Sequence, residues 1–155
     1  MNRFMSFRHV AIAVAALVVL GLGLPATAAH PVPFQGRADL AITGFQDFPP
    51  ATRVLTASAI GQATHLGRFT RTETITADLS TGAFTGTLVF IAANGDQLNA
   101  NVIGQFSPTF DSAEGTYVFT GAPNGRFRNA SGQAAFKVTS DGTGFHVTFN
   151  GTIQY

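Results

Sequence analysis

The sequence predicts an all-β protein, and three observations carry that prediction. The composition favours strands and turns, because the chain holds 15 Phe and 17 Gly, many Thr and only 2 Met. Most segments alternate apolar and polar residues, and none shows the sustained 3.6-residue period of a helix. Short segments rich in Gly, Asn and Ser separate the alternating ones, as in antiparallel strands joined by turns. About eight such strands in one domain close as an up-and-down barrel or split into a sandwich.

The N-terminal segment has the features of a secretory signal peptide. Two arginines precede an unbroken apolar run, Val10–Leu24, and small residues follow in Ala26–Ala28. The run is short for a membrane span and ends in a cleavage-like site, which favours a signal over an anchor. We therefore expect a signal peptide at residues 1–28, a barrel domain at residues 29–155, and a secreted or periplasmic protein without an integral membrane segment after cleavage.

The composition also excludes several function classes. Removal of residues 1–28 takes away Arg3 and Arg8, so the formal charge moves from +1 to −1. A chain this close to neutral lacks the basic footprint of a nucleic-acid-binding protein. The chain contains no Cys, so disulfides and thiolate sites are excluded. We expect no cofactor and no metal, because the histidines show no His-x-His or His-x₃-His spacing.

The first two strands differ in how clearly they alternate. Arg37–Thr43 places Ala38, Leu40 and Ile42 on one face and predicts the first strand. The segment Gly44–Ala51, which contains Pro49 and Pro50, is interpreted as a loop. The second strand is expected over Thr52–Ile60, and its orientation stays open because both of its faces are similarly apolar.

The third strand, Arg68–Leu79, has one face made almost entirely of threonine. Thr-rich faces are commonly solvated, so the opposite face is expected to point inward. That face carries Arg71 and Glu73 between Phe69 and Ile75. A charged pair is therefore predicted inside the barrel.

The next two strands form a predicted hairpin. Ala83–Ala92 is apolar on both faces, and Gln97–Phe106 alternates clearly, with Leu98 and Val102 facing inward. Between them, Asn94-Gly95 favours a type I′ turn.

The last three strands surround a glycine- and arginine-rich connection, Gly121–Gly132. Gly115–Thr120 presents Tyr117 and Phe119 on one face. The remaining two strands, Gln133–Thr139 and Phe145–Tyr155, alternate over their whole length. Glycines inside strands, namely Gly86, Gly104 and Gly151, favour the barrel over the sandwich, because closure needs bends.

The C-terminal part resembles a known barrel group. Gly125-Arg126-Phe127 with Ala130-Ser131-Gly132 resembles the G-x-G-[RK]-F-x-x-A-x-G segment of dirigent and allene oxide cyclase-like proteins, although Asn124 stands where Gly-Thr usually leads in. Thr64–Thr70 and Ala93–Leu98 also look like segments of secreted bacterial proteins of unassigned function. The resemblance covers about Gly61–Tyr155 and implies a calycin-like barrel with a central cavity. No catalytic residue of those families maps onto this chain.

Arg71 and Glu73, with Phe69 beside them, are the first candidate for a ligand site. A charged pair inside an apolar cavity gives a small molecule a polar handle. The alternative, which we weight more heavily, is a structural pair whose members satisfy one another or sit hydrated near a rim.

His65, Tyr117 and Arg126 complete the candidate ligand-binding set. His65 lies in a glycine-flanked turn, where bonding to backbone is the simpler interpretation. Tyr117 shares a face with Phe119. Arg126 is placed either to line a cavity mouth or to belong to a lid in which Phe127 plugs one end of the barrel. We favour the lid.

These features favour a binding module for a small apolar or amphipathic ligand, possessing no catalytic residue that the sequence identifies. Three alternatives stay open: an allene oxide cyclase-like isomerase using Arg71, Glu73 and His65; a structural or interaction barrel without a ligand; and a small outer-membrane barrel. The sequence gives neither the ligand nor the oligomeric state.

Overall fold

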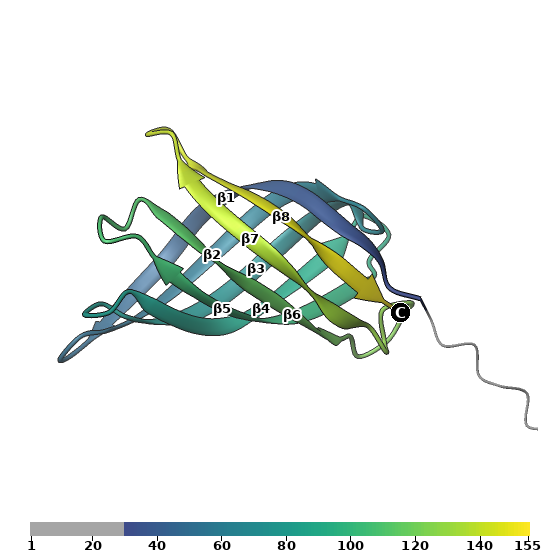
Figure 1. The fold of residues 1–155 in the computed structure, drawn as a ribbon, viewed down its shortest axis with the longest axis horizontal. Coiled ribbons are helices and arrows are strands. Elements are labelled where there is room, and N and C mark those ends of the chain that lie inside the picture. The colour runs from purple at the N-terminus through teal and green to yellow at the C-terminus, as the bar shows by residue number, and fades with distance from the viewer. Residues whose placement is uncertain (1–29) are drawn as a thin grey trace, which may run out of the picture.

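The structure, a computed structural model, describes residues 30–155 and shows a closed barrel (Figure 1). The strands are β1 (Val32–Phe48), β2 (Thr52–Ala63), β3 (Gly67–Asp78), β4 (Ala83–Ala92), β5 (Gln97–Phe106), β6 (Ser112–Gly121), β7 (Ser131–Ser140) and β8 (Phe145–Gln154). Each strand pairs antiparallel with the next, and β8 pairs with β1. The predicted class, an all-β antiparallel barrel of eight strands, is confirmed. The predicted signal peptide, residues 1–28, lies outside the described residues.

The connections divide between the two ends of the barrel. Because neighbouring strands run in opposite directions, the β1–β2, β3–β4, β5–β6 and β7–β8 connections lie at one end, here called the open end. The β2–β3, β4–β5 and β6–β7 connections lie at the other, here called the closed end, together with the start of β1 and the end of β8. In Figure 1 the label C marks the closed end, and the yellow β7–β8 loop lies at the open end.

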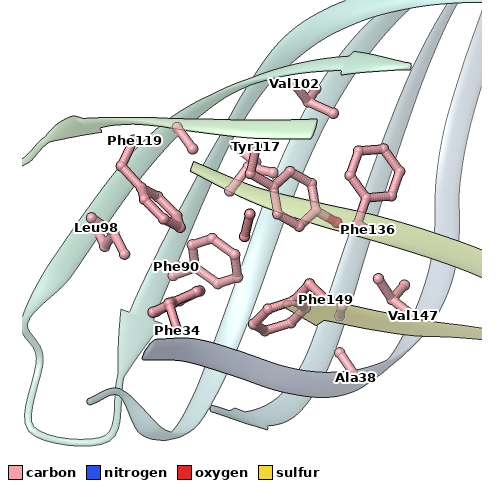
Figure 2. Close-up of a cluster of buried hydrophobic side chains, with 14 of the residues drawn as sticks. Phe34, Ala38, Phe90, Leu98, Val102, Tyr117, Phe119, Phe136, Val147 and Phe149 are labelled. Atoms are coloured by element: carbon pink, nitrogen blue, oxygen red, sulfur yellow. The ribbon is translucent and has the colours of Figure 1, made fainter. Parts of the chain in front are cut away.

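Alternate residues point into the barrel and form one continuous apolar core. Aromatic rings fill the half of the core near the closed end. The ring of Phe34 has its centroid 4.8 Å from that of Phe119, 5.4 Å from Phe149 and 6.0 Å from Phe90 (Figure 2). The inward faces predicted for β3 and β5 are correct, and the alternation of β7 and β8 places Phe136, Val147 and Phe149 in the core. The open question about β2 is answered by Ala57 and Ala59, which are buried.

Many of the polar side chains lie on the outer surface of the barrel. Thr72, Thr74 and Thr76 are exposed on β3, as are Thr148 and Asn150 on β8. A transmembrane barrel has an apolar outer band and a polar interior, so the polarity here is the reverse of that pattern. Separately, residues 30–155 include no helix with the length and apolar character needed to cross a membrane.

Glycines inside the strands allow aromatic rings to lie directly on the backbone. A Cβ at Gly36 would come within 2.4 Å of the ring of Phe149, its cross-strand partner on β8. Gly104 and its partner Phe84 repeat this arrangement between β5 and β4, again at 2.4 Å. These close approaches fit the expectation that strand glycines accompany barrel closure.

The prediction for the first strand and the following loop is wrong in extent. β1 runs from Val32 to Phe48, through most of the segment interpreted as a loop. Pairing with β2 continues to Phe48 because a bulge between Ile42 and Gly44 takes up one extra residue. Pairing with β8 ends at Leu40. The last part of β1 therefore projects past β8 at the open end.

The predicted type I′ turn is also wrong. The β4–β5 connection spans four residues, Ala93–Asp96, and only Gly95 has a positive φ, at 87°. A type I′ turn requires positive φ at both central residues. The Asn94 side chain instead bonds Asp96, whose backbone N–H it accepts at 3.1 Å.

Candidate functional site

The closed end is sealed by the β6–β7 connection. Phe127 is fully buried and belongs to the same core cluster as Leu66 and Ala130, which are also buried. The ring of Phe127 packs edge-on against Tyr155, with centroids 4.9 Å apart. The chain turns sharply into this lid at Gly121, which has a φ of 83° and where a Cβ would come within 2.6 Å of the backbone oxygen of Arg128. The predicted lid around Phe127 is thus present.

His65 and Arg126 belong to the outside of this lid. Arg126 forms an ion pair with Asp96 at 3.0 Å and donates to the backbone carbonyl of His65. His65 Nε2 lies 3.0 Å from Pro33 O, so it carries the proton that this carbonyl accepts. In the neutral ring Nδ1 then accepts from the Tyr155 hydroxyl at 3.0 Å. Both ring nitrogens are therefore engaged in holding the closed end together.

The half of the barrel near the open end contains a cavity of about 150 Å³. Its wall is largely apolar and comes from all eight strands together with the β3–β4 and β5–β6 connections. Most of the wall is made of Leu40, Ile42, Leu55, Ile75, Ala77, Leu79, Phe84, Val102, Phe106, Phe110, Ala113, Phe136, Val138 and Phe145. Ile42 and Phe110 are 45% and 43% exposed, so the cavity meets solvent between β1 and the β5–β6 loop.

The polar floor of the cavity consists of Arg71, Glu73 and Tyr117. Arg71 Nη1 donates to Tyr117 Oη at 2.7 Å, and Arg71 Nη2 lies 3.2 Å from Glu73 Oε2. The guanidinium also lies over aromatic rings, 5.5 Å from the centroid of Tyr117 and 5.9 Å from that of Phe90. These three side chains mark the boundary between the packed half and the hollow half.

Burial controls the protonation of this floor. It raises the pKa of Glu73 above its ordinary value of 4.5, and the charge of Arg71 offsets part of that rise. Burial likewise raises the pKa of Tyr117 to about 12, so the phenol keeps its proton at neutral pH. The floor therefore consists of one guanidinium that contacts a carboxyl group and a hydroxyl, inside an apolar wall.

The structure divides the predicted site residues into two groups. Arg71, Glu73 and Tyr117 meet at the cavity floor. Phe69 lies on the closed-end side of them, buried with its centroid 5.2 Å from Phe90, and does not line the cavity. His65 and the lid arginine lie at the opposite end of the barrel from the opening. The proposed combination of Arg71, Glu73 and His65 in one site is therefore not formed.

Sequence reasoning did not select the residues of the cavity mouth. Phe110 lines the cavity from the β5–β6 loop with a φ of 57°, which is unusual for a bulky residue and often accompanies functional loops. Leu55 and Phe106 line it from strands. The order of the strands could have identified these residues. In an up-and-down barrel, odd-numbered strands end and even-numbered strands begin at the same end, so inward residues at those positions lie together at the open end.

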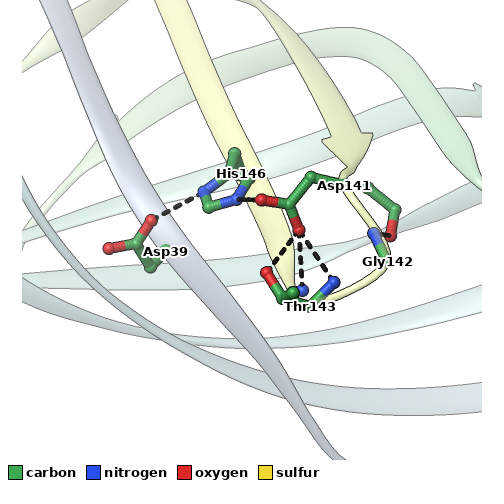
Figure 3. A network of polar contacts seen from close by, with 7 residues as sticks. Asp39, Asp141, Gly142, Thr143 and His146 are labelled. Carbon is green, nitrogen blue, oxygen red and sulfur yellow. Dashed lines mark hydrogen bonds and ion pairs between the residues drawn. The ribbon is translucent and has the colours of Figure 1, made fainter.

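A second polar cluster lies on the outside, at the end of the β1–β8 ladder (Figure 3). His146 Nδ1 lies 2.8 Å from Asp39 Oδ1, and Nε2 lies 3.0 Å from Asp141 Oδ2. Since the two carboxylates occupy opposite sides of the ring, they cannot share one ion with it. No cluster of potential metal ligands is found within residues 30–155. The contacts join the β7–β8 loop to β1.

Comparisons with known proteins add no relative to this geometry. No protein-family profile matches the sequence, and no curated protein matches it either. The resemblance to the dirigent and allene oxide cyclase-like group stays a prediction. Function is therefore argued from the cavity and its floor.

Proposed function

We propose that this protein is an exported binding barrel that holds one small apolar or amphipathic molecule in its hollow half. The observation that carries the proposal is an apolar cavity, open at one end, that stops at a buried Arg71–Glu73 pair. Burying an ion pair costs free energy, and apolar residues of similar volume often stabilise a core as well or better. Packing alone therefore does not explain why the interior contains a layer of polar side chains, whereas a ligand site does. Export rests on the predicted signal peptide at residues 1–28.

The size and wall of the cavity support this proposal. A dry cavity of about 150 Å³ is large enough for a benzene-sized molecule. The mouth extends the apolar surface, because Phe45 is 65% exposed on the projecting part of β1 and Phe110 faces the opening from the β5–β6 loop. A longer chain is accommodated by leaving the cavity along this surface. Such sites join an apolar wall to a few polar groups that orient the ligand.

Isomerisation of the bound molecule is a second candidate function, favoured by one observation. The carboxyl of Glu73 has a raised pKa and lies at the buried floor of the cavity, which suits a proton donor or acceptor. This candidate requires a ligand that leaves the cavity chemically changed. An isomer has the same mass as the starting molecule, so liquid chromatography and proton nuclear magnetic resonance of the ligand before and after incubation with the protein distinguish isomerisation from simple binding.

The proposal is tested with N-phenyl-1-naphthylamine, a neutral probe that fluoresces when it enters an apolar site. Purified residues 29–155 are expected to bind it with a saturable rise in fluorescence. Ala77→Phe fills the cavity wall and is expected to reduce binding at least about tenfold, since the substituted ring occupies the ligand volume. Ala135→Phe is the matched control, because Ala135 is exposed on the outer face of β7.

Circular dichroism first establishes that both variants fold. If Ala77→Phe does not fold, Val138→Phe replaces it, because Val138 lines the cavity and is only half-buried. Binding that is equal in the cavity variant and in Ala135→Phe would place the probe outside the barrel. That result, or no saturable binding at all, would favour the structural barrel over the binding module.

A further inference from the structure

The cavity floor presents a hydrogen-bond acceptor rather than a cation. The side chain of Arg71 is 1% exposed, and both of its Nη atoms have partners in Tyr117 and Glu73. Its Nε has no partner within the described residues but is itself buried, so a ligand does not reach it. The side chain of Glu73 is 9% exposed and has Arg71 as its single polar partner within residues 30–155. A molecule that enters from the open end therefore meets the carboxyl of Glu73.

The open end of the barrel, around the mouth of the cavity, carries more acidic than basic side chains. Among the described residues, four aspartates lie at the open end, on or next to its four connections: Asp47, Asp78, Asp111 and Asp141. Arg53, which lines the mouth, is already held by Asp47 through two hydrogen bonds of 2.6 and 2.8 Å. A rim with this balance attracts cations, admits neutral molecules and repels anions.

The floor and the rim select the same kind of ligand, although they lie in different layers of the barrel. A carboxylate head on the floor would lie against the carboxyl of Glu73, and the donor that remains there, the hydroxyl of Tyr117, belongs to a side chain that is only 1% exposed. A buried charge that is poorly paired is strongly unfavourable. An ammonium or hydroxyl head donates to Glu73 directly. Its apolar chain then follows the wall from Ile75 toward Ile42 and Phe110.

We propose, building on the binding function above, that the ligand is a small amphiphile whose head group is a hydrogen-bond donor, an amine or an alcohol, bound head-first on Glu73. Carboxylic acids with the same chain are rejected. The chain points outward through the open end.

Three eight-carbon probes that differ only in the head group test this inference. Octylamine, octanol and octanoate each compete with N-phenyl-1-naphthylamine, at concentrations below self-association and at pH 7. Octylamine and octanol are expected to displace the fluorescent probe, and octanoate is expected to be at least about tenfold weaker than either. Comparison of the first two determines whether charge or hydrogen bonding dominates.

Glu73→Gln separates the floor from the rim. It removes the negative charge and keeps an acceptor, so octylamine is expected to lose affinity about tenfold while octanol changes little. Glu114→Gln is the matched control, because Glu114 is exposed on the outer face of β6 and the same charge is removed without touching the cavity. It is expected to leave all three affinities unchanged.

The outcomes distinguish this inference from the proposed function. Octanoate binding as tightly as octylamine would overturn the inference and leave the binding function standing. A preference for octylamine that persists in Glu73→Gln would place the head at the mouth, which overturns the head-first orientation. Failure of the fluorescent probe itself to bind would overturn the binding function on which the inference depends.

Discussion

The packed half and the hollow half of the barrel share the same strands but use different side chains. Toward the closed end, fully buried rings such as Phe34 and Phe90 meet edge to face across the interior. Toward the open end, small inward residues such as Ala77 and Ala113 stand where rings would be needed to fill the space. An eight-stranded barrel is wide enough to be filled by side chains or to hold one small ligand. Side-chain size at inward positions, and not strand number, decides which of these occurs in each half.

The layer between the halves is energetically unlike either. Arg71 is the one buried charged residue within the described part of the chain, and it is neutralised in place by Glu73 and bonded by Tyr117. Water is excluded on the side of the closed end by Phe69 and Phe90. Two comparisons of variants test this division into packed half, polar layer and hollow half, beginning with the one expected to have the larger effect.

Phe90→Ala in the packed half is expected to cost about 3–5 kcal/mol of unfolding free energy, because the ring leaves a cavity that its neighbours cannot fill. Phe106→Ala in the hollow half is expected to cost only about 1–2 kcal/mol, since Phe106 is half-buried and already borders empty volume. Urea denaturation measures both. Equal costs would show that the two halves are packed alike.

Arg71→Met is expected to cost about 3 kcal/mol, because it leaves the carboxyl of Glu73 buried without its partner. The double variant Arg71→Met with Glu73→Leu removes both charges and is expected to recover most of that loss. The same denaturation experiment measures the coupling between the two sites. A double variant as unstable as the single one would mean that the two side chains do not depend on each other.

The smallest effect on stability is expected at the outer contacts of His146 with Asp39 and Asp141, near the open end. Hydrogen bonds to Asp141 and Asp39 raise the pKa of His146 above its ordinary value of 6.5. A raised pKa in the folded state means that the protonated ring stabilises the fold below pH 6.5, and that this contribution is lost as pH rises through the raised pKa. Stability differences between the native chain and His146→Gln should therefore shrink with rising pH.

Nuclear magnetic resonance titration of the His146 ring measures this directly, and Asp141→Asn should bring its pKa down toward 6.5. An unshifted pKa of His146 in the native chain would contradict the contacts of its ring with Asp39 and Asp141. So would a stability difference that grows with pH.

The sequence predicts the strands well where alternation alone is sufficient. β3, β5, β7 and β8 each have one clearly apolar face, and the spacing of two between Arg71 and Glu73 places both inside. The extent of β1 was not predictable in this way, because Gly44 and the two prolines are typical of a loop while the long-range pairing with β2 holds the segment in a strand.

The position of a residue along the barrel axis was also not predictable from local alternation. Arg71 lies four residues into β3 from the closed end, which is roughly 13 Å along the tilted strand at about 3.3 Å per residue. His65 lies just before that strand, at the closed end itself. The local alternation of residues predicts whether a side chain points into or out of the barrel. Its depth along the barrel axis follows only from the number of residues between it and the end of its strand, once the strands are known to form a closed sheet.

The rings that lie on strand glycines also affect how the barrel assembles. Phe149 needs a residue without a side chain opposite it, and on β1 its neighbours two positions away from Gly36 are Phe34 and Ala38. A slip of two residues keeps every inward residue facing inward, so the alternating pattern by itself does not prevent it. In the slipped register the Phe149 ring clashes with a side chain where it otherwise lies on the glycine backbone, and this steric clash destabilises the misaligned sheet. Gly36 with Phe149, and Gly104 with Phe84, thus act as alignment marks that distinguish the correct closure of the sheet from its near copies.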